Sequence, residues 1–247
     1  MLAAKSCATV STFRPSTKML SFPVQSDQLV ERALERSGQL HEAMSEILAL
    51  ACDDVVLLNL MGTNVGLASA GLSMEHGDSV LTLVARGNPN TATAILRMQF
   101  ESMLRGAWAI YAATEQEIEA LEREITIEAD VQARQLASYS KMFKALRKED
   151  CSVPHALLDE LSRVDDVLRH GLNSFIHGGF QPLKHQSDGF PLHLMLQVIE
   201  TSNAISTMTS ALFAVLVDDG GMRMARLNAM LIEFRDVLPE MTIVLQK

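Results

Sequence analysis

Four side chains in the segment 97–108 could together bind an anion. At 100° per residue, Arg97, Glu101, Arg105 and Trp108 fall within about 80° of one another on a predicted helix. Glu101 lies one turn from each arginine, so it can pair with either. The guanidinium that Glu101 leaves free could bind phosphate or another anion, because arginine presents a planar fork of donors. A structural ion-pair network beside a buried Trp108 is the alternative.

The second candidate segment, 169–179, could carry out acid–base chemistry. Asn173 and His177 lie one turn apart on a predicted helix, and Arg169 lies one turn before Asn173. Gly178 suits a left-handed C-cap, which places His177 in the last turn, where the helix dipole favours imidazolium. Arg169, Asn173 and His177 are therefore candidate catalytic residues. The same side chains could instead tether a helix end to a loop.

The two segments read R-x-x-F-E-x-x-x-R-x-x-W and L-N-S-F-x-H-G-G. Together they resemble a bacterial family of helical proteins of unknown function, over roughly Asp27 to Leu238. The resemblance brings no activity with it.

The second segment is also loosely similar to the HEPN superfamily of helical bundles, many of which are metal-independent ribonucleases in defence or toxin–antitoxin systems. Their motif combines an arginine, a polar residue and a catalytic histidine a few residues later. Asn173 and His177 match the last two, whereas Leu172 stands where the arginine belongs. This resemblance implies RNA cleavage through Asn173 and His177, and a homodimer with its site at the interface.

The spacing of Gly and Pro predicts the elements that position these residues. Neither residue type occurs in 107–153 or 192–219, and short strands need turns far more often, so the chain is predicted to be all-α. Glu115–Lys148 is rich in good helix formers and is predicted as one long helix, capped by Thr114 and Glu117. Other helices are predicted over Asp27–Ala51, Ser73–Arg86, 90–113, 154–178 with a bend near Gly171, 192–217 and 221–238, with a polar loop before Pro191. We expect a single HEPN-like bundle of seven or eight helices.

Composition narrows the class of protein. The chain has 247 residues, 48% hydrophobic and 21% charged, which excludes intrinsic disorder. A net charge of −9 excludes a whole-chain positive field for DNA and disfavours RNA unless a local basic groove exists. The three cysteines match no zinc or redox spacing, and no motif for a cofactor or metal occurs.

These observations leave the domain plan simple and the function open. Residues 1–26 are expected to form a loose N-terminal tail and 27–247 a helical domain in the cytoplasm, with no membrane span, because polar residues interrupt the apolar stretch Val55–Leu72. One hypothesis is a HEPN-like protein that acts on RNA. The alternative is a non-catalytic module that binds a partner protein or a small anion. Because isolated buried charges are costly, we expect the two polar segments to meet in one cluster.

Overall fold

The computed structural model describes residues 24–58, 60–127, 136–216 and 221–239. All regular structure in these residues is helical, as the spacing of Gly and Pro predicts. Nine helices are described, which exceeds the predicted seven or eight. They are α1 (Val24–Leu58), α2 (Thr63–Ala85), α3 (Pro89–Tyr111), α4 (Glu115–Glu122), α6 (Tyr139–Leu146), α7 (His155–Ile176), α8 (Phe180–Asp188), α9 (Leu192–Ala214) and α10 (Met222–Glu233).

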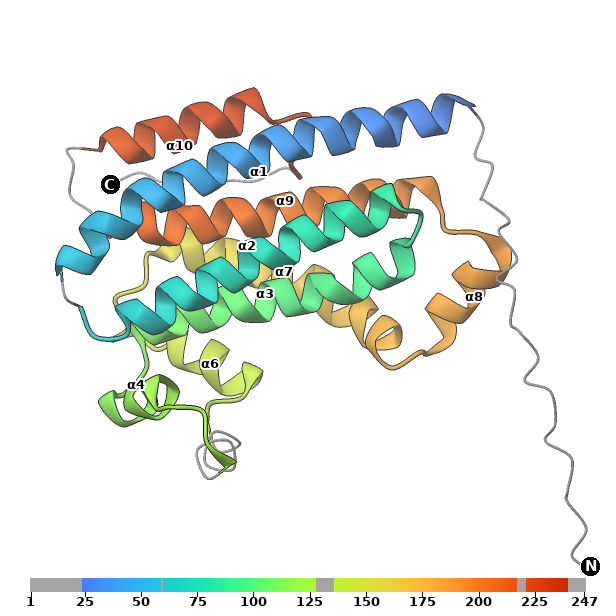
Figure 1. Ribbon diagram of the computed structural model, residues 1–247. Coiled ribbons are helices and arrows are strands. Elements are labelled where there is room, and N and C mark those ends of the chain that lie inside the picture. The colour runs from blue at the N-terminus through green and yellow to red at the C-terminus, as the bar shows by residue number, and fades with distance from the viewer. Residues whose placement is uncertain (1–23, 59, 128–135, 217–220, 240–247) are drawn as a thin grey trace, which may run out of the picture.

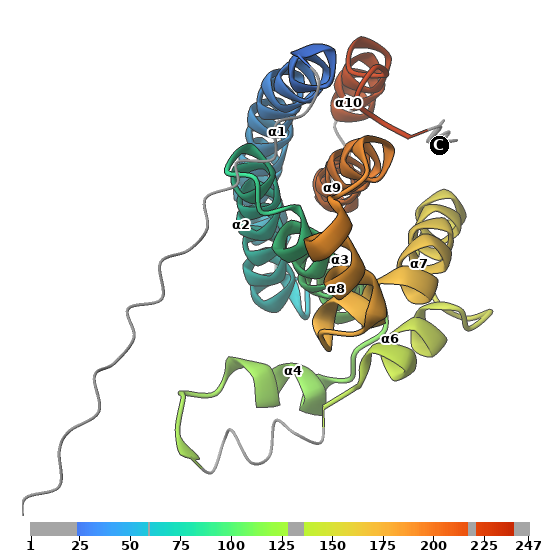
Figure 2. The ribbon, with the colours of Figure 1, turned by 90° about the vertical axis from the view of Figure 1, so that its right-hand side faces the viewer.

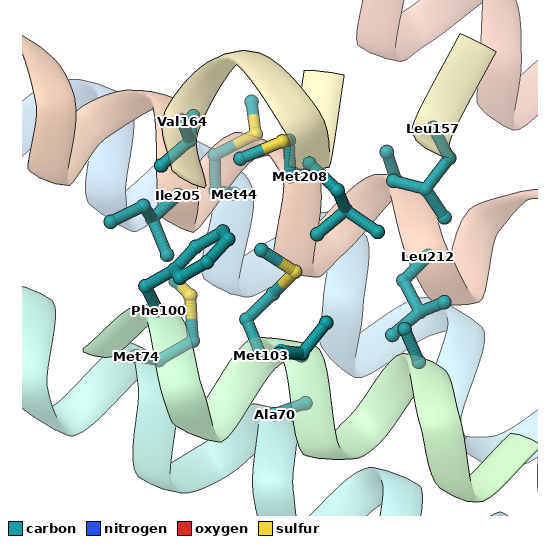
Figure 3. Close-up of a cluster of buried hydrophobic side chains, with 14 of the residues drawn as sticks. Met44, Ala70, Met74, Phe100, Met103, Leu157, Val164, Ile205, Met208 and Leu212 are labelled. Carbon is teal, nitrogen blue, oxygen red and sulfur yellow. The ribbon is translucent and has the colours of Figure 1, made fainter. Parts of the chain in front are cut away.

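Helix α9 runs through the middle of the molecule, with α1, α2, α3, α7 and α10 around it (Figures 1 and 2). Every residue from Ser202 to Ala214 is buried. A helix buried on all sides must meet neighbours on every face. Figure 3 shows how these neighbours supply the apolar core around α9, whose labelled members include Met44 of α1, Phe100 and Met103 of α3, and Ile205 of α9 itself.

Buried polar side chains also join α9 to α2 and α3. The Gln99 side chain is fully buried; its Nε2 donates to the Ser202 carbonyl at 3.0 Å and to Ser206 Oγ at 3.1 Å, and its Oε1 accepts from Ser202 Oγ at 2.9 Å. Ser73 Oγ donates to the Gln99 carbonyl and lies 3.1 Å from Thr209 Oγ1. We call these five residues the polar seam. Because buried polar groups need partners, the seam fixes how the three helices are rotated against one another.

Two further buried contacts join α9 to the other side of the molecule. Asn203 Nδ2 donates to Ser37 Oγ of α1 at 2.7 Å and to the Val237 carbonyl after α10 at 2.8 Å. Ser210 Oγ donates to the Met44 carbonyl of α1 at 2.8 Å. Helix α9 is therefore held on opposite sides by directional bonds as well as by apolar packing.

The predicted long helix over Glu115–Lys148 is wrong. The capping box of Thr114 and Glu117 is present, but α4 ends at Glu122, and Arg123 takes extended dihedrals of −64° and 151°. Residues 128–135 lie outside the described residues.

Helix α6 explains why the chain leaves the helical path. It packs on α3 and buries Met142, Phe143 and Leu146. Burial of three large apolar side chains outweighs a helix propensity that differs among ordinary residues by less than about 1 kcal/mol each.

Other boundaries differ from the sequence predictions where tertiary contacts decide. Helix α2 begins at Thr63 rather than Ser73, and a turn at Gly62, with φ of +80°, divides the apolar stretch. Helix α7 runs through Gly171 without a break, and α8 occupies the predicted polar loop. Most of the expected tail, residues 1–23, lies outside the described residues. No helix in the described ranges is long and apolar enough to cross a membrane.

Two glycines of α2 test the importance of the polar seam. A Cβ at Gly77 would lie 2.9 Å from both Gln99 Nε2 and Ser206 Oγ, whereas a Cβ at Gly71 would meet nothing within 4 Å. We predict that Gly77→Ala lowers the free energy of unfolding by about 1–3 kcal/mol through overpacking. Gly71→Ala should raise it by about 0.5–1 kcal/mol, because alanine favours the helix. Urea denaturation measures both, and an equal gain for the two variants would contradict the tight packing at Gly77.

A buried histidine beside the seam makes stability depend on pH. His41 of α1 is buried, and its Nε2 lies 3.4 Å from Asp78 Oδ1 of α2. Burial lowers the pKa of His41 by more than the Asp78 charge raises it. The unfolded chain therefore binds a proton at His41 more readily than the folded chain does. The contribution of neutral His41 to the free energy of unfolding is fully present above about pH 6.5, the pKa of an unperturbed histidine. It is lost as the pH falls from there toward the lowered pKa of His41 in the folded chain.

We predict that wild type loses more stability than His41→Gln when the pH changes from about 8 to about 5. The other ionisable groups are common to both proteins, so the difference between the two losses isolates His41. Equal losses in urea denaturation would show that His41 does not contribute.

Candidate functional site

The structure brings the two predicted polar segments together at Arg97. Its Nε donates to Glu101 Oε1 at 2.7 Å, one turn along α3. Its Nη1 donates to Asn173 Oδ1 of α7 at 3.1 Å. The expected meeting of the segments is thus confirmed for Arg97 and Asn173. The guanidinium is held in place from two sides, by a carboxylate on its own helix and by an amide on another.

A third helix completes this arrangement. The Arg97 Cζ lies 5.1 Å from the ring centroid of Tyr139, the first residue of α6. The Tyr139 hydroxyl donates to Asp165 Oδ1 of α7, and Asp165 is only 1% exposed. Arg97 of α3 thus contacts both α6 and α7, and Tyr139 of α6 contacts α7, so each of the three helices is linked to the other two. The cation–π attraction between Arg97 and Tyr139 adds to the hydrogen bonds.

These links surround a cavity of about 180 Å³, which we call the Arg97 pocket. A volume of this size admits a few waters or one small polar group. Buried Phe100 forms part of its wall, while exposed Ser140 and Asn173 mark its solvent side. The complete lining is Arg97, Phe100, Tyr139, Ser140, Asp165, Leu168 and Asn173.

The other three candidate residues of the first segment are not part of this lining, although Glu101 pairs with Arg97 beside it. Glu101 pairs with Arg97 and does not bridge to Arg105, for which no hydrogen bond or ion pair exists with the described residues. Trp108 is 1% exposed and belongs to the apolar core. The structure therefore separates a pocket half of the segment, with Arg97 and Glu101, from a core half that ends in Trp108.

The second segment lies at the edge of the pocket. His177 is the C-cap of α7 and Gly178 follows with φ of +60°, as the sequence predicts. The His177 side chain is exposed, one turn beyond Asn173, and forms no hydrogen bond or ion pair within the described part of the chain. Arg169 belongs to α7, but its side chain lies outside the described residues.

Sequence reasoning missed Tyr139, Ser140 and Asp165. Asp165 carries a signal that could have found it: it falls four residues after Leu161 and three before Leu168, on the apolar side of α7. An acid at a core position is a strong sign of a polar site. The sequence around Tyr139 carries no comparable signal, because the predicted helix over Glu115–Lys148 places Tyr139 within a continuous helix. Among the described residues, no group of three or more His, Cys, Asp or Glu side chains could hold a metal ion.

Comparison with known proteins identifies a family but not an activity. A model of a family of unknown function, DUF6988, matches residues 70–240. The chain belongs to this family. Both polar segments of this DUF6988 protein fall inside the match, which begins well after Asp27, where the resemblance was expected to start. No curated protein and no solved structure matches the chain, so the HEPN similarity stays a prediction.

The site predicts a difference in stability between two variants. Arg97→Ala removes the bonds to Glu101 and Asn173 and the contact with the Tyr139 ring, and should lower the free energy of unfolding by about 1 kcal/mol, because the partners left behind are partly solvated. His177→Ala removes an exposed side chain that forms no hydrogen bond or ion pair within the described residues, and should change this free energy by less than about 0.5 kcal/mol. Urea denaturation compares the two. If His177→Ala unfolds as readily as Arg97→Ala, the histidine has a structural role.

Proposed function

We propose that this DUF6988 protein binds a small anionic group in the Arg97 pocket. The observation that carries the proposal is the position of the Arg97 guanidinium, which Glu101 holds at Nε and Asn173 holds at Nη1. Nη2 of Arg97 and Nδ2 of Asn173 form no hydrogen bond within the described residues, and both side chains line the pocket. Donors from two helices thus converge on one cavity, with the Ser140 hydroxyl nearby, and charge-assisted hydrogen bonds to such donors suit phosphate or carboxylate oxygens.

The carboxylates around Arg97 restrict the charge of the ligand. Glu101 neutralises much of the Arg97 charge from beside the pocket, and Asp165 places a carboxylate in the lining itself. A dianion would be repelled by both acids, in a chain of net charge −9. A monoanion such as a phosphodiester fits this balance better than inorganic phosphate does.

Cleavage of RNA is the second candidate, and one contact favours it. Arg97 binds Asn173, the polar residue of Asn-x-x-x-His, and so supplies from α3 the guanidinium that buried Leu172 does not. In this mechanism His177 takes the proton of a ribose 2′-hydroxyl, and the freed oxygen attacks the phosphorus. The bond to the 5′-oxygen breaks, that oxygen receives a proton through water from the His177 imidazolium, and Arg97 stabilises the charge on the phosphate.

A homodimer would suit this second candidate. Ile176 and Phe180, on either side of His177, and Leu183 of α8 are exposed apolar side chains. An apolar surface of this kind beside the histidine is what self-association through α7 and α8 would cover. A partner protein, in place of a second copy of the chain, is the other candidate to cover this surface.

A location in the cytoplasm fits the cysteines, whose spacing matches neither a metal site nor a disulfide framework.

The proposed binding predicts a specific pattern among variants. Dimethyl phosphate, a monoanionic phosphodiester, should bind wild type in calorimetric titration, and Arg97→Lys should weaken it about tenfold, because lysine keeps the charge but loses the planar fork. Arg86→Lys, at the exposed end of α2, is the matched control and should bind as wild type does. Absence of binding to wild type, or full affinity in Arg97→Lys, would contradict the proposal.

The same proteins separate binding from cleavage. A fluorescent RNA oligonucleotide incubated with chelator present reports cleavage without metal. If RNA cleavage is the function, His177→Ala should lose it and still bind dimethyl phosphate. Binding without cleavage by wild type would support the non-catalytic module instead.

A further inference from the structure

Helix α6 carries a row of positive charge that begins at the Arg97 pocket. Residues 139–148 contain four cations and no acid, in a chain whose net charge is −9. The first turn of α6 reaches the pocket, because Tyr139 and Ser140 belong to its lining. The four cations are all exposed, and we call them the α6 stripe: Lys141, Lys144, Arg147 and Lys148.

Helix geometry places the α6 stripe on the solvent side of α6. The helix packs on α3 and buries three large apolar side chains there, so its opposite side is open. Lys144 lies one turn after Ser140, and Lys148 lies one turn after Lys144. Figure 2 shows α6 at the edge of the molecule, next to α7. The stripe therefore extends from the solvent side of the pocket along an exposed helix.

Acidic side chains do not neutralise the α6 stripe. None of its four cations forms an ion pair with a described residue, whereas Lys184 of α8, for example, pairs with Asp188 at 2.7 Å. Arg147 donates to Ser162 Oγ of α7 at 3.1 Å, and its Cζ lies 4.2 Å from the centroid of the Phe143 ring. These two contacts orient Arg147 but leave its charge in place. A group of uncompensated cations attracts a ligand that carries several negative charges.

The net negative charge of the chain does not cancel this local attraction. At physiological ionic strength, charges in solvent act over only ~8 Å, so distant acids have little effect at the stripe. Glu149 and Asp150 follow Lys148 directly and end the stripe on that side. The positive surface is therefore bounded, and it runs from the opening of the Arg97 pocket to Lys148.

We infer that the Arg97 pocket and the α6 stripe together bind a single-stranded nucleic acid, with one phosphodiester in the pocket and its neighbours along α6. The inference rests on the function proposed for the pocket and names the class of molecule that supplies the phosphodiester. Every linkage of a nucleic acid is a monoanionic phosphodiester, so one polymer supplies both the group for Arg97 and the charges for the stripe. From Ser140 to Lys148 the helix rises ~12 Å, and one strand of B-form DNA carries a charge about every 3.4 Å of axis. The stripe thus spans more than one phosphate.

A single strand suits this surface better than a duplex or a membrane. A flexible strand can bend one phosphate into the pocket, whereas a duplex is stiff over about 150 base pairs. A helix that binds a membrane surface inserts apolar side chains, and those of α6 are buried on α3. Contacts between cations and phosphates do not depend on the bases, so binding should be independent of base sequence.

A short and a long ligand test this inference on the full chain. Calorimetry measures binding of dimethyl phosphate, and fluorescence anisotropy measures binding of a labelled 2′-O-methyl oligouridine of about twelve nucleotides. The 2′-O-methyl groups prevent cleavage by a 2′-hydroxyl. Lys144→Gln/Lys148→Gln should weaken the oligonucleotide about tenfold and leave dimethyl phosphate unchanged, because neither lysine lines the pocket. The slope of log K against log salt should become shallower by ~1.4, because each lost phosphate contact to a single strand contributes ~0.7.

A matched control separates the α6 stripe from net charge. Arg86→Gln/Arg235→Gln also removes two exposed cations, from α2 and from the segment after α10, and should weaken the oligonucleotide far less. Arg97→Lys should weaken the oligonucleotide as well as dimethyl phosphate, because one phosphate of the strand occupies the pocket. Circular dichroism verifies that each variant is folded. Equal weakening by the two double variants, or full oligonucleotide affinity in Arg97→Lys, would overturn the inference.

The two ligands also separate failure of this inference from failure of the proposed function. If dimethyl phosphate does not bind wild type, the function proposed for the pocket fails, and this inference fails with it. If dimethyl phosphate binds but the oligonucleotide binds no more tightly, only the inference fails. Displacement of the oligonucleotide by polyglutamate or by phosphatidylglycerol vesicles at equal charge concentration would overturn the assignment to a nucleic acid.

Discussion

The fold depends on the part of α9 from Ser202 to Ala214, which is buried on all sides and yet carries polar side chains. Ser202, Asn203, Ser206, Thr209 and Ser210 of α9 lie in the core, where a hydroxyl or amide without a partner costs about 1–3 kcal/mol. Apolar packing alone would let neighbouring helices slide or rotate, because it has no direction. Hydrogen bonds that join α9 to α1, α2, α3 and the segment after α10 remove that freedom. The most polar part of the core is thus also the part that specifies the arrangement.

This constraint on α3 also positions the Arg97 pocket. Gln99 must face α9 to satisfy Ser202 and Ser206. Arg97 stands two residues earlier, about 200° around the helix, and so faces away from α9. On that side it meets Tyr139 and Asn173. Helix α3 therefore places the Gln99 amide in the core and the Arg97 guanidinium in the surface pocket. A rotation of α3 would displace both groups.

The local features of the chain were predictable from sequence, and the pairings only in part. Gly and Pro spacing gave the all-α class, and the cost of isolated charge gave the meeting of Arg97 with Asn173. Sequence spacing does not determine whether Glu101 pairs with Arg97 or Arg105, because both lie one turn away. The structure decides for Arg97, which also donates from Nη1 to Asn173 and places its guanidinium over the Tyr139 ring. The packing of α6 against α3 interrupts the expected long helix and brings Tyr139 to the pocket. The local sequence does not predict this packing, because its stabilisation comes from a contact between segments far apart in the chain.

Two neighbouring residues of α9 connect the Arg97 pocket physically with a second pocket, the α1–α9 pocket, which is formed by the first halves of α1 and α9 and the segment after α10. Ser202 binds Gln99, which orients the helix that carries Arg97, and Asn203 binds Val237, which forms a wall of the α1–α9 pocket. Successive residues on a helix point about 100° apart, so one short stretch reaches both sides of the molecule. A rotation of α9 that widened either pocket would break hydrogen bonds that shape the other. The shapes of both pockets therefore rest on the same buried turn of helix, and a substitution there should alter the two sites together rather than one at a time.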